Sequence, residues 1–453
     1  MAYSSFNFGA PNHEEAPAYE VSEVKSQEVE DLSLTIQNKI IDLIQVMPER
    51  DDLDAKVLVN KMVQEELRNE LQRVKKHLSA SDKMAVQNSV MDEIFGFGPI
   101  TKLLDDPTVT EIMVNGPFSV FVEKNGKLHK APTKFRNDRH VYHTIDKIIA
   151  PLGRRVDESS PMVDARLPDG SRVNVIIPPL AVTGPTITIR KFAANPYTLD
   201  NLITFGTLNL EMASFFKSCV RGRLNIIVSG GTGSGKTTLL NVLSGFIPHD
   251  ERIVTIEDAA ELQLQQEHVI SLESRPSNIE GKGRITIRDL VVNSLRMRPD
   301  RIIVGEVRSA ETLDMLQAMN TGHDGSITTV HANTPRDSLA RLETMIHMGG
   351  IELPSRAIRE QIASSINIII QISRYPDGSR KISKVTEITG MEGDTITLQD
   401  LFLFNQEGYD INSNVTGRHV STGVVPTFMD RLKTYGENIH PNIFKPATNK
   451  EGF

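Results

Sequence analysis

Residues 224–243 read LNIIVSGGTGSGKTTLLNVL. The apolar run 224–228 predicts a buried strand, and the residues after it fit the pattern G-x-x-x-x-G-K-[ST] from Gly230 to Thr237. A helical pattern then continues to Leu243. This order predicts a phosphate-binding loop, because glycines let backbone N–H groups turn towards phosphate oxygens at the positive end of a helix. A glycine-rich turn without a ligand is the alternative, and the agreement of pattern and context argues against it.

The loop supplies the candidate nucleotide ligands. Lys236 is expected to place a compact positive charge near the β- and γ-phosphates of ATP, and Thr237 to offer its hydroxyl to Mg²⁺. The expected phosphate-binding residues are Gly230, Gly231, Thr232, Gly233, Ser234, Gly235, Lys236, Thr237 and Thr238.

Strand-like apolar runs continue on the C-terminal side of this loop and alternate with helical patterns. They occupy residues 225–228, 253–256, 302–304, 327–330 and 368–372. Such alternation predicts an α/β fold whose parallel sheet is covered by helices on both faces.

Acidic residues follow two of these runs. Hydrolysis needs a carboxylate near the metal and one that orients the attacking water. Glu306 follows the run 302–304 and is expected at the carboxyl edge of the sheet, where ligands bind in open α/β folds. Glu306 is our candidate for water activation, with a surface salt bridge as the alternative. Glu257 is expected to reach the metal through water, whereas its neighbour Asp258 could instead cap a helix.

Two histidines bracket another run. His323 precedes residues 327–330 and His331 follows them. A neutral imidazole at either position could sense the γ-phosphate or couple it to a domain movement. A purely structural role is the alternative for each.

Several regions are expected along the chain. The first thirty residues carry two prolines and a run of glutamates, with almost no large aliphatic residue after Phe8. Beyond them, Ile36, Ile40 and later aliphatic residues recur at helical spacing. A role in core packing and a role in docking a partner both fit these helices. We expect a disordered acidic segment (1–30), a helical module (31–90), a small α+β domain (91–193), a linker (194–205), the α/β domain (206–410) and a polar tail (411–453).

Composition limits the class of protein. The 453 residues carry a formal charge of -8 without a basic stripe, so direct nucleic-acid binding is not expected. The single cysteine, Cys219, excludes an internal disulfide framework and fits a reducing cytosol. No apolar run approaches the ~20 residues of a membrane-spanning helix, and the N-terminus does not resemble a signal peptide. Membrane contact is therefore expected through a partner.

Five motifs together resemble those of the secretion traffic ATPases. They are the glycine loop, TIED at 255–258, RIIVGEVR at 301–308, TGH at 321–323 and TVHAN at 329–333. Two upstream segments, DPTVTEIMVNG at 106–116 and GRRVDE at 153–158, resemble the tight-adherence, or Flp-type, pilus assembly ATPases of the CpaF/TadA branch. The resemblance covers about residues 90–405.

This resemblance implies a RecA-like motor domain, a smaller N-terminal domain that covers the nucleotide, and a homo-hexameric ring. It also implies Glu306 as the catalytic glutamate, Glu257 in an aspartate box, and His323 and His331 in a histidine box. Asp300 precedes the strand instead of ending it, which leaves the direct Mg²⁺ carboxylate open. The implied protein is cytoplasmic and peripheral at the inner face of the membrane, where it contacts a polytopic platform protein.

Two other functions share this motor chemistry. A type IV secretion ATPase for DNA or effector transfer is the main alternative, and a non-catalytic nucleotide-gated scaffold would require a broken catalytic set. An added arginine is expected to complete each site. The candidates are Arg190 before the linker, Arg154, Arg155 and Arg172 in the same domain, and Arg296, Arg298 and Arg308 in the motor domain.

Overall fold

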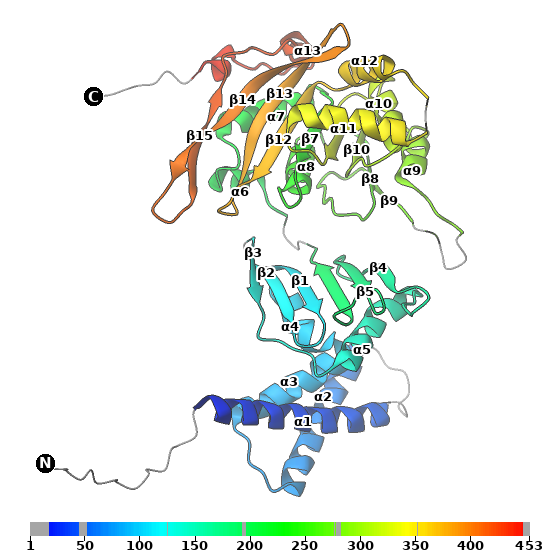
Figure 1. Cartoon of the computed structure of the whole chain (residues 1–453), viewed down its shortest axis with the longest axis vertical. Helices are drawn as coiled ribbons and strands as arrows, with labels where there is room; N and C mark the ends of the chain where they lie inside the picture. The colour runs from blue at the N-terminus through cyan, green and yellow to red at the C-terminus, as the bar shows by residue number, and fades with distance from the viewer. Residues whose placement is uncertain are drawn as a thin grey trace, which may run out of the picture. The chain divides into compact units, whose positions relative to one another are not determined.

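The computed structural model describes residues 18–44, 52–124, 126–192, 196–275, 277, 282–350 and 352–446. The chain forms two compact units, Met1–Phe192 and Ala193–Phe453, which are described separately (Figure 1).

Three helices open the N-terminal unit: α1 (Ala18–Ile44), α2 (Asp52–Arg73) and α3 (Ala80–Phe95). They share a small apolar core to which each contributes, with Ile36 and Ile40 from α1, Val63 from α2 and Val90 from α3. Ser79 caps α3 by accepting a hydrogen bond from the Asp82 amide at 3.1 Å.

The expected disordered segment 1–30 is wrong for residues 18–30, which belong to α1. The glutamates and lysine there are good helix formers, and they continue a helix whose later turns pack in the core. Residues 1–17 lie outside the described residues.

A six-stranded antiparallel sheet forms the rest of this unit, in the order β3-β2-β1-β6-β5-β4. Alternate residues such as Ile112 and Val114 are buried against a core that includes Ile145 of α5. The elements are η1 (Gly98–Ile100), α4 (Thr101–Asp105), β1 (Val109–Asn115), β2 (Val120–Lys124), β3 (Lys127–Lys130), α5 (Asp138–Ile149), η2 (Ala150–Leu152), β4 (Met162–Arg166), β5 (Arg172–Ile176) and β6 (Thr186–Arg190).

The C-terminal unit contains a nine-stranded sheet in the order β15-β14-β13-β12-β7-β11-β10-β8-β9. The six strands from β12 to β9 are parallel, and β13, β14 and β15 extend this sheet antiparallel. The strands are β7 (Ile226–Gly230), β8 (Ile253–Glu257), β9 (Val269–Glu273), β10 (Arg301–Val304), β11 (Ile327–Val330), β12 (Ile368–Arg374), β13 (Arg380–Glu392), β14 (Thr395–Tyr409) and β15 (Val415–Ser421).

Two apolar cores lie on opposite faces of this sheet. Ile226 and Val228 of β7 join one core and Ile227 joins the other, as the two-residue period of a strand requires. The helices are α6 (Leu199–Thr204), α7 (Leu210–Arg221), α8 (Lys236–Ser244), α9 (Ile287–Ser294), α10 (Glu311–Asn320), α11 (Pro335–Met348), α12 (Ser355–Ser365), α13 (Met429–Thr434) and η3 (Pro441–Phe444). Helices α9 to α12 serve one core and α7, α8 and α13 the other (Figure 1). The expected α/β fold, with a parallel sheet covered by helices on both faces, is confirmed.

The expected polar tail at 411–453 is wrong for its described part. Strand β15 pairs with β14, and Phe428, Leu432 and Phe444 are buried. The Phe444 ring meets that of Phe215 in α7 edge-on, with centroids 5.6 Å apart. A few aromatic anchors therefore hold a mostly polar segment onto the core.

The expected linker at 194–205 also contains structure, because α6 occupies Leu199–Thr204 and is capped by Thr198. Across the described ranges, no helix combines the length and the apolar character that a membrane crossing requires.

Candidate nucleotide-binding and hydrolysis site

The glycine loop joins the buried strand β7 to the start of α8. Gly235 has a φ of +96°, a conformation that side chains disfavour, and it caps a helix whose first residue is Lys236. A Cβ on Gly230 would lie only 2.5 Å from both the Ile372 carbonyl oxygen and the Ser234 hydroxyl. Glycine is therefore required at these two positions by the shape of the loop itself.

Polar side chains hold the loop in its curve. The Lys236 Nζ donates to the Gly231 carbonyl at 3.1 Å, and the Ser234 hydroxyl donates to the same oxygen at 2.9 Å. A Cβ on Gly231 would meet no atom within 4 Å, and Thr232 is exposed.

The loop fits the phosphates of a nucleotide. It faces open space at Gly231 and leads into the N-terminus of a nine-residue helix, whose free N–H groups and dipole favour an anion. Thr237 and Thr238 lie in the first turn of that helix. The assignment of the Thr237 hydroxyl to a magnesium ion stays a prediction.

Glu306 follows β10 at the same carboxyl edge of the sheet, separated from that strand only by Gly305. Its carboxylate accepts a hydrogen bond from the Nε of Arg308 at 2.7 Å, and a second guanidinium nitrogen pairs with it. Arg308 also reaches Asp258, with 3.3 Å between Nη1 and Oδ2. Burial opposes the charge on Arg308, but Glu306 and Asp258 outweigh it and raise the pKa of the guanidinium. The arrangement joins two acids through one arginine.

Glu257 is placed differently from Glu306. It ends β8 and is buried, and its Oε1 accepts hydrogen bonds from the amides of Glu261 at 3.0 Å and Leu262 at 3.2 Å. A Cβ on Gly305 would lie 2.9 Å from the Glu257 Cγ, so the two chain segments touch. Glu257 therefore supports the turn after β8 at the base of the site.

The alternative role of Asp258 as a helix cap is wrong, since residues 258–268 are irregular throughout. Asp258 instead accepts a hydrogen bond from the Ser274 hydroxyl at 3.0 Å and pairs with Arg308. It thus shares an ion-pair network with Glu306.

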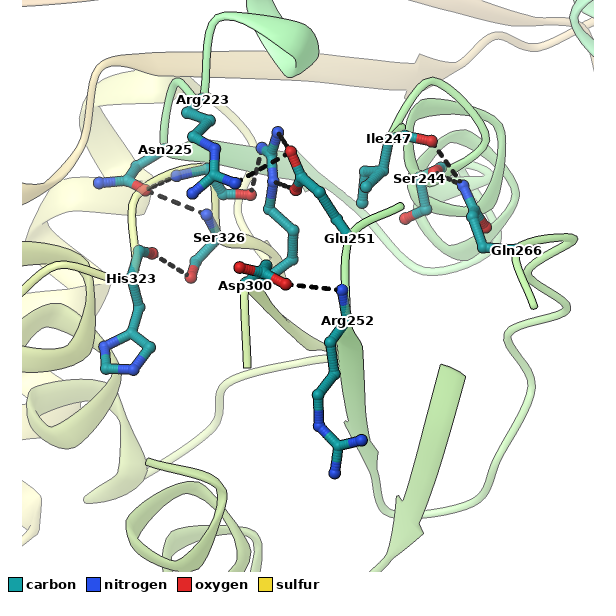
Figure 2. A network of polar contacts seen from close by, with 12 residues as sticks. Arg223, Asn225, Ser244, Ile247, Glu251, Arg252, Gln266, Asp300, His323 and Ser326 are labelled. Carbon is teal, nitrogen blue, oxygen red and sulfur yellow. Dashed lines mark hydrogen bonds and ion pairs between the residues drawn. The ribbon is translucent and has the colours of Figure 1, made fainter. Parts of the chain in front are cut away.

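The two histidines lie at opposite ends of β11. His331 follows the carboxyl end, where burial and then the positive charge of Lys236 lower the pKa of its imidazole, while Glu306 raises it. His331 therefore shares an electrostatic environment with the loop and Glu306. His323 lies before the amino end, where its carbonyl accepts a hydrogen bond from the Ser326 hydroxyl at 2.8 Å (Figure 2). Four strand residues span about 13 Å, so the two histidines lie at opposite edges of the sheet. The role expected for His323 stays a prediction.

The amino edge of the sheet holds a buried polar network instead of a catalytic site. Arg301 is fully buried and pairs with Glu251, which also pairs with Arg223 at 3.1 Å. Asp300 accepts a hydrogen bond from the Arg252 amide at 2.8 Å, which places it away from the glycine loop (Figure 2). Asp300 is therefore not available as the direct Mg²⁺ ligand.

Asn225 belongs to the same edge and was missed by sequence reasoning. Its Oδ1 accepts hydrogen bonds from the amides of Gly325 at 2.8 Å and Ser326 at 3.1 Å (Figure 2). A polar residue inside the apolar run 224–228 was the available signal, because a buried side-chain amide requires partners.

The candidate arginines divide between the two units. Arg308 lies in the site, whereas Arg296 and Arg298 are exposed and precede β10 at its amino end. In the N-terminal unit, Arg190 ends β6 beside Glu111. The other three have local partners there: Arg154 donates to the Asp164 carbonyl, Arg155 pairs with Asp157, and Arg172 lies 3.6 Å from Asp164.

Arg380 is a contact that sequence reasoning missed. It begins β13, and its Nε donates to the Gly233 carbonyl of the loop at 3.0 Å. The turn sequence Pro376-Asp377-Gly378 between two strand patterns could have indicated a hairpin there. Its position against the loop follows from the pairing of β12 with β7, which the sequence does not display.

Comparison with known proteins adds the family context. A family model described as Type II/IV secretion system protein matches residues 93–432. A putative conjugal transfer protein of Mycobacterium tuberculosis is 35% identical over 322 residues, which cover 70% of this chain and 91% of that protein. The type IV secretion system protein VirB11 of Bartonella henselae is 32% identical over 327 residues, covering 63% and 90%. The solved VirB11 ATPase of Brucella suis, in complex with sulphate, is 28% identical with a TM-score of 0.35, covering 63% of this chain and 94% of that one.

Proposed function

We propose, because the chain belongs to the family of Type II/IV secretion system proteins, that it is an ATP-hydrolysing motor which powers assembly of a tight-adherence, or Flp-type, pilus. The main support for the proposal is that the glycine loop, Glu306 and His331 lie together at the carboxyl edge of one parallel sheet. All three lie within the region that the family model matches.

Each residue has a separate task in this proposal. The loop amides and Lys236 bind the phosphates, and the Thr237 hydroxyl binds the magnesium ion, which neutralises negative charge on the phosphate oxygens. Glu306 orients the attacking water once its carboxylate turns from Arg308. Arg308 then remains paired with Asp258, so the site keeps the positive charge near the reacting phosphate. Glu257 keeps the turn after β8 in place and contacts the metal only through water.

His331 is proposed to report on the terminal phosphate. Its lowered pKa favours the neutral imidazole at neutral pH, which can both donate and accept a hydrogen bond. His323 has no part in this step because it lies at the other end of β11.

The pilus assignment is supported by the two upstream segments, 106–116 and 153–158, that resemble the tight-adherence ATPases. Transfer of DNA or effector proteins is the second candidate, and the names of the conjugal transfer and VirB11 relatives favour it. In either case we propose a homo-hexamer at the cytoplasmic face of the inner membrane, in contact with a polytopic platform protein. Arg190 is the candidate for completing a site from the N-terminal unit.

The experiment replaces the chromosomal copy with Lys236→Ala or Glu306→Gln and follows two outputs in the same cells. Surface fibres are counted by electron microscopy, and the transfer frequency of a mobilisable plasmid is measured. The pilus proposal predicts the loss of fibres with transfer unchanged. Loss of transfer with normal fibres would refute it and support the second candidate.

A further inference from the structure

Two arginines lie opposite each other in the hairpin formed by β12 and β13. Strand β12 ends at Arg374 and β13 begins at Arg380, and these residues pair directly across the hairpin. Asp377 fixes the turn between them, because it accepts hydrogen bonds from the amides of Ser379 at 2.9 Å and Val415 at 2.7 Å. The hairpin is therefore a braced element of the sheet.

Both arginines lie against the middle of the glycine loop. The Arg380 Nε donates to the Gly233 carbonyl at 3.0 Å, and its Cδ is 3.2 Å from where a Cβ on Gly235 would lie. The Arg374 Nη1 is 3.4 Å from the corresponding position at Gly233. Because both glycines lack a side chain and have positive φ, the two side chains can approach the loop backbone.

This contact lies on the opposite flank of the loop from the hydrolytic residues. In the sheet order, β12 and β13 are on one side of β7, whereas β11 and β10, which lead to His331 and Glu306, are on the other. The arginine pair is thus separated from the residues assigned to the attacking water.

We propose that Arg380 positions the glycine loop for binding and that Arg374 and Arg380 together set the affinity for the nucleotide, not the rate of its hydrolysis. The inference rests on the proposed ATPase function. Because Arg380 already holds the Gly233 carbonyl, less of the loop has to become ordered when the nucleotide binds. In addition, two positive charges beside the loop attract any anion bound there. Since the pair is remote from Glu306, the effect applies to ADP and ATP alike.

The test compares Arg380→Gln, Arg380→Lys and Arg374→Gln in the full-length protein. The matched control is Arg418→Gln, whose arginine in β15 is more than half exposed and pairs with Glu407. Calorimetry with Mg·ADP gives the Kd, steady-state kinetics give KM and kcat for ATP, and circular dichroism gives the melting temperature without nucleotide.

The proposal predicts that Arg380→Gln raises the Kd for ADP and the KM for ATP about tenfold, with kcat within about twofold of the wild type. Arg374→Gln raises both values less, and Arg380→Lys recovers part of the loss because it keeps the charge. Arg418→Gln leaves all values unchanged.

Three results would overturn the proposal. A fall in kcat with unchanged Kd would place the arginines in hydrolysis, and unchanged Kd in all variants would remove any role in binding. A lower melting temperature with unchanged Kd in the folded fraction would show that the two arginines only stabilise the fold. Wild-type protein that binds no ADP would instead refute the proposed function, so the two failures are distinguishable.

Discussion

Replacing Glu251 with alanine tests how the sheet of the C-terminal unit is held together at its amino edge. Arg301, the first residue of β10, is fully buried. Its guanidinium pairs with Glu251 through two nitrogens and donates to the Gly325 carbonyl at 3.2 Å. Burial lowers the pKa of Arg301, although its partner Glu251 raises it. The glutamate is therefore the main source of compensation for this charge.

The expected loss in the free energy of unfolding follows from the burial of Arg301, the partner that remains after Glu251→Ala. Removing one member of a buried pair leaves an uncompensated charge, which lowers the free energy of unfolding by about 3–5 kcal/mol. Glu251→Gln should cost less, because the amide oxygen still accepts a hydrogen bond from Arg301. Replacing both partners by Glu251→Leu and Arg301→Met should cost less than Glu251→Ala alone, because the fully buried charge is then removed. Arg223 loses Glu251 in both variants, and its side chain is partly exposed.

Urea unfolding followed by circular dichroism is the assay, since the chain has no tryptophan for fluorescence. The control is Glu407→Ala, because Glu407 and its partner Arg418 are both more than half exposed and their pair contributes under about 1 kcal/mol. Mg·ADP affinity should stay normal in folded Glu251→Gln, since the glycine loop lies at the other edge of the sheet. If Glu251→Ala cost no more than Glu407→Ala, the reasoning from burial would be refuted.

Two further predictions concern pH. Burial is the main cause that lowers the pKa of His419 from 6.5 to about 4, so its stability contribution is full above pH 6.5 and is lost as the pH falls towards 4. Between pH 7 and pH 4.5, the free energy of unfolding should fall by about 2 kcal/mol more in the wild type than in His419→Gln. Urea unfolding at the two pH values measures this difference, and equal losses in the two proteins would contradict the prediction. The second prediction concerns ATP hydrolysis. Because the pKa of His331 lies below its usual value of 6.5, we predict that kcat falls only when the pH is lowered below 6.5. His331→Asn should remove this acidic limb and His323→Asn should keep it, so a pH profile altered by the His323 variant would count against the assignment.

The glycine loop and the parallel strands could be predicted because their signals are local. A fixed spacing of glycines, lysine and threonine defines the loop, and uninterrupted aliphatic runs define buried strands. Glu306 was placed at the correct edge of the sheet because it directly follows such a run. A residue before a strand lies at the opposite edge from a residue after it, so His323 lies away from Glu306 and His331.

The remaining errors involve contacts between segments distant in sequence. The C-terminal segment is mostly polar, and its burial depends on Phe428, Leu432 and Phe444 meeting α7 and β14. Arg374 and Arg380 reach the glycine loop only through the pairing of β12 with β7. No local pattern encodes either arrangement, because each depends on the order of strands in the sheet.

The most direct test of the central claim is to measure ATP binding and hydrolysis by purified Lys236→Ala and Glu306→Gln proteins side by side. Lys236 contacts the carbonyl of Gly231 within the loop, whereas Glu306 lies beyond β10. We predict that Lys236→Ala loses ATP binding, and that Glu306→Gln binds ATP with near wild-type affinity while kcat falls at least about a hundredfold. A Glu306→Gln enzyme with wild-type turnover would contradict it.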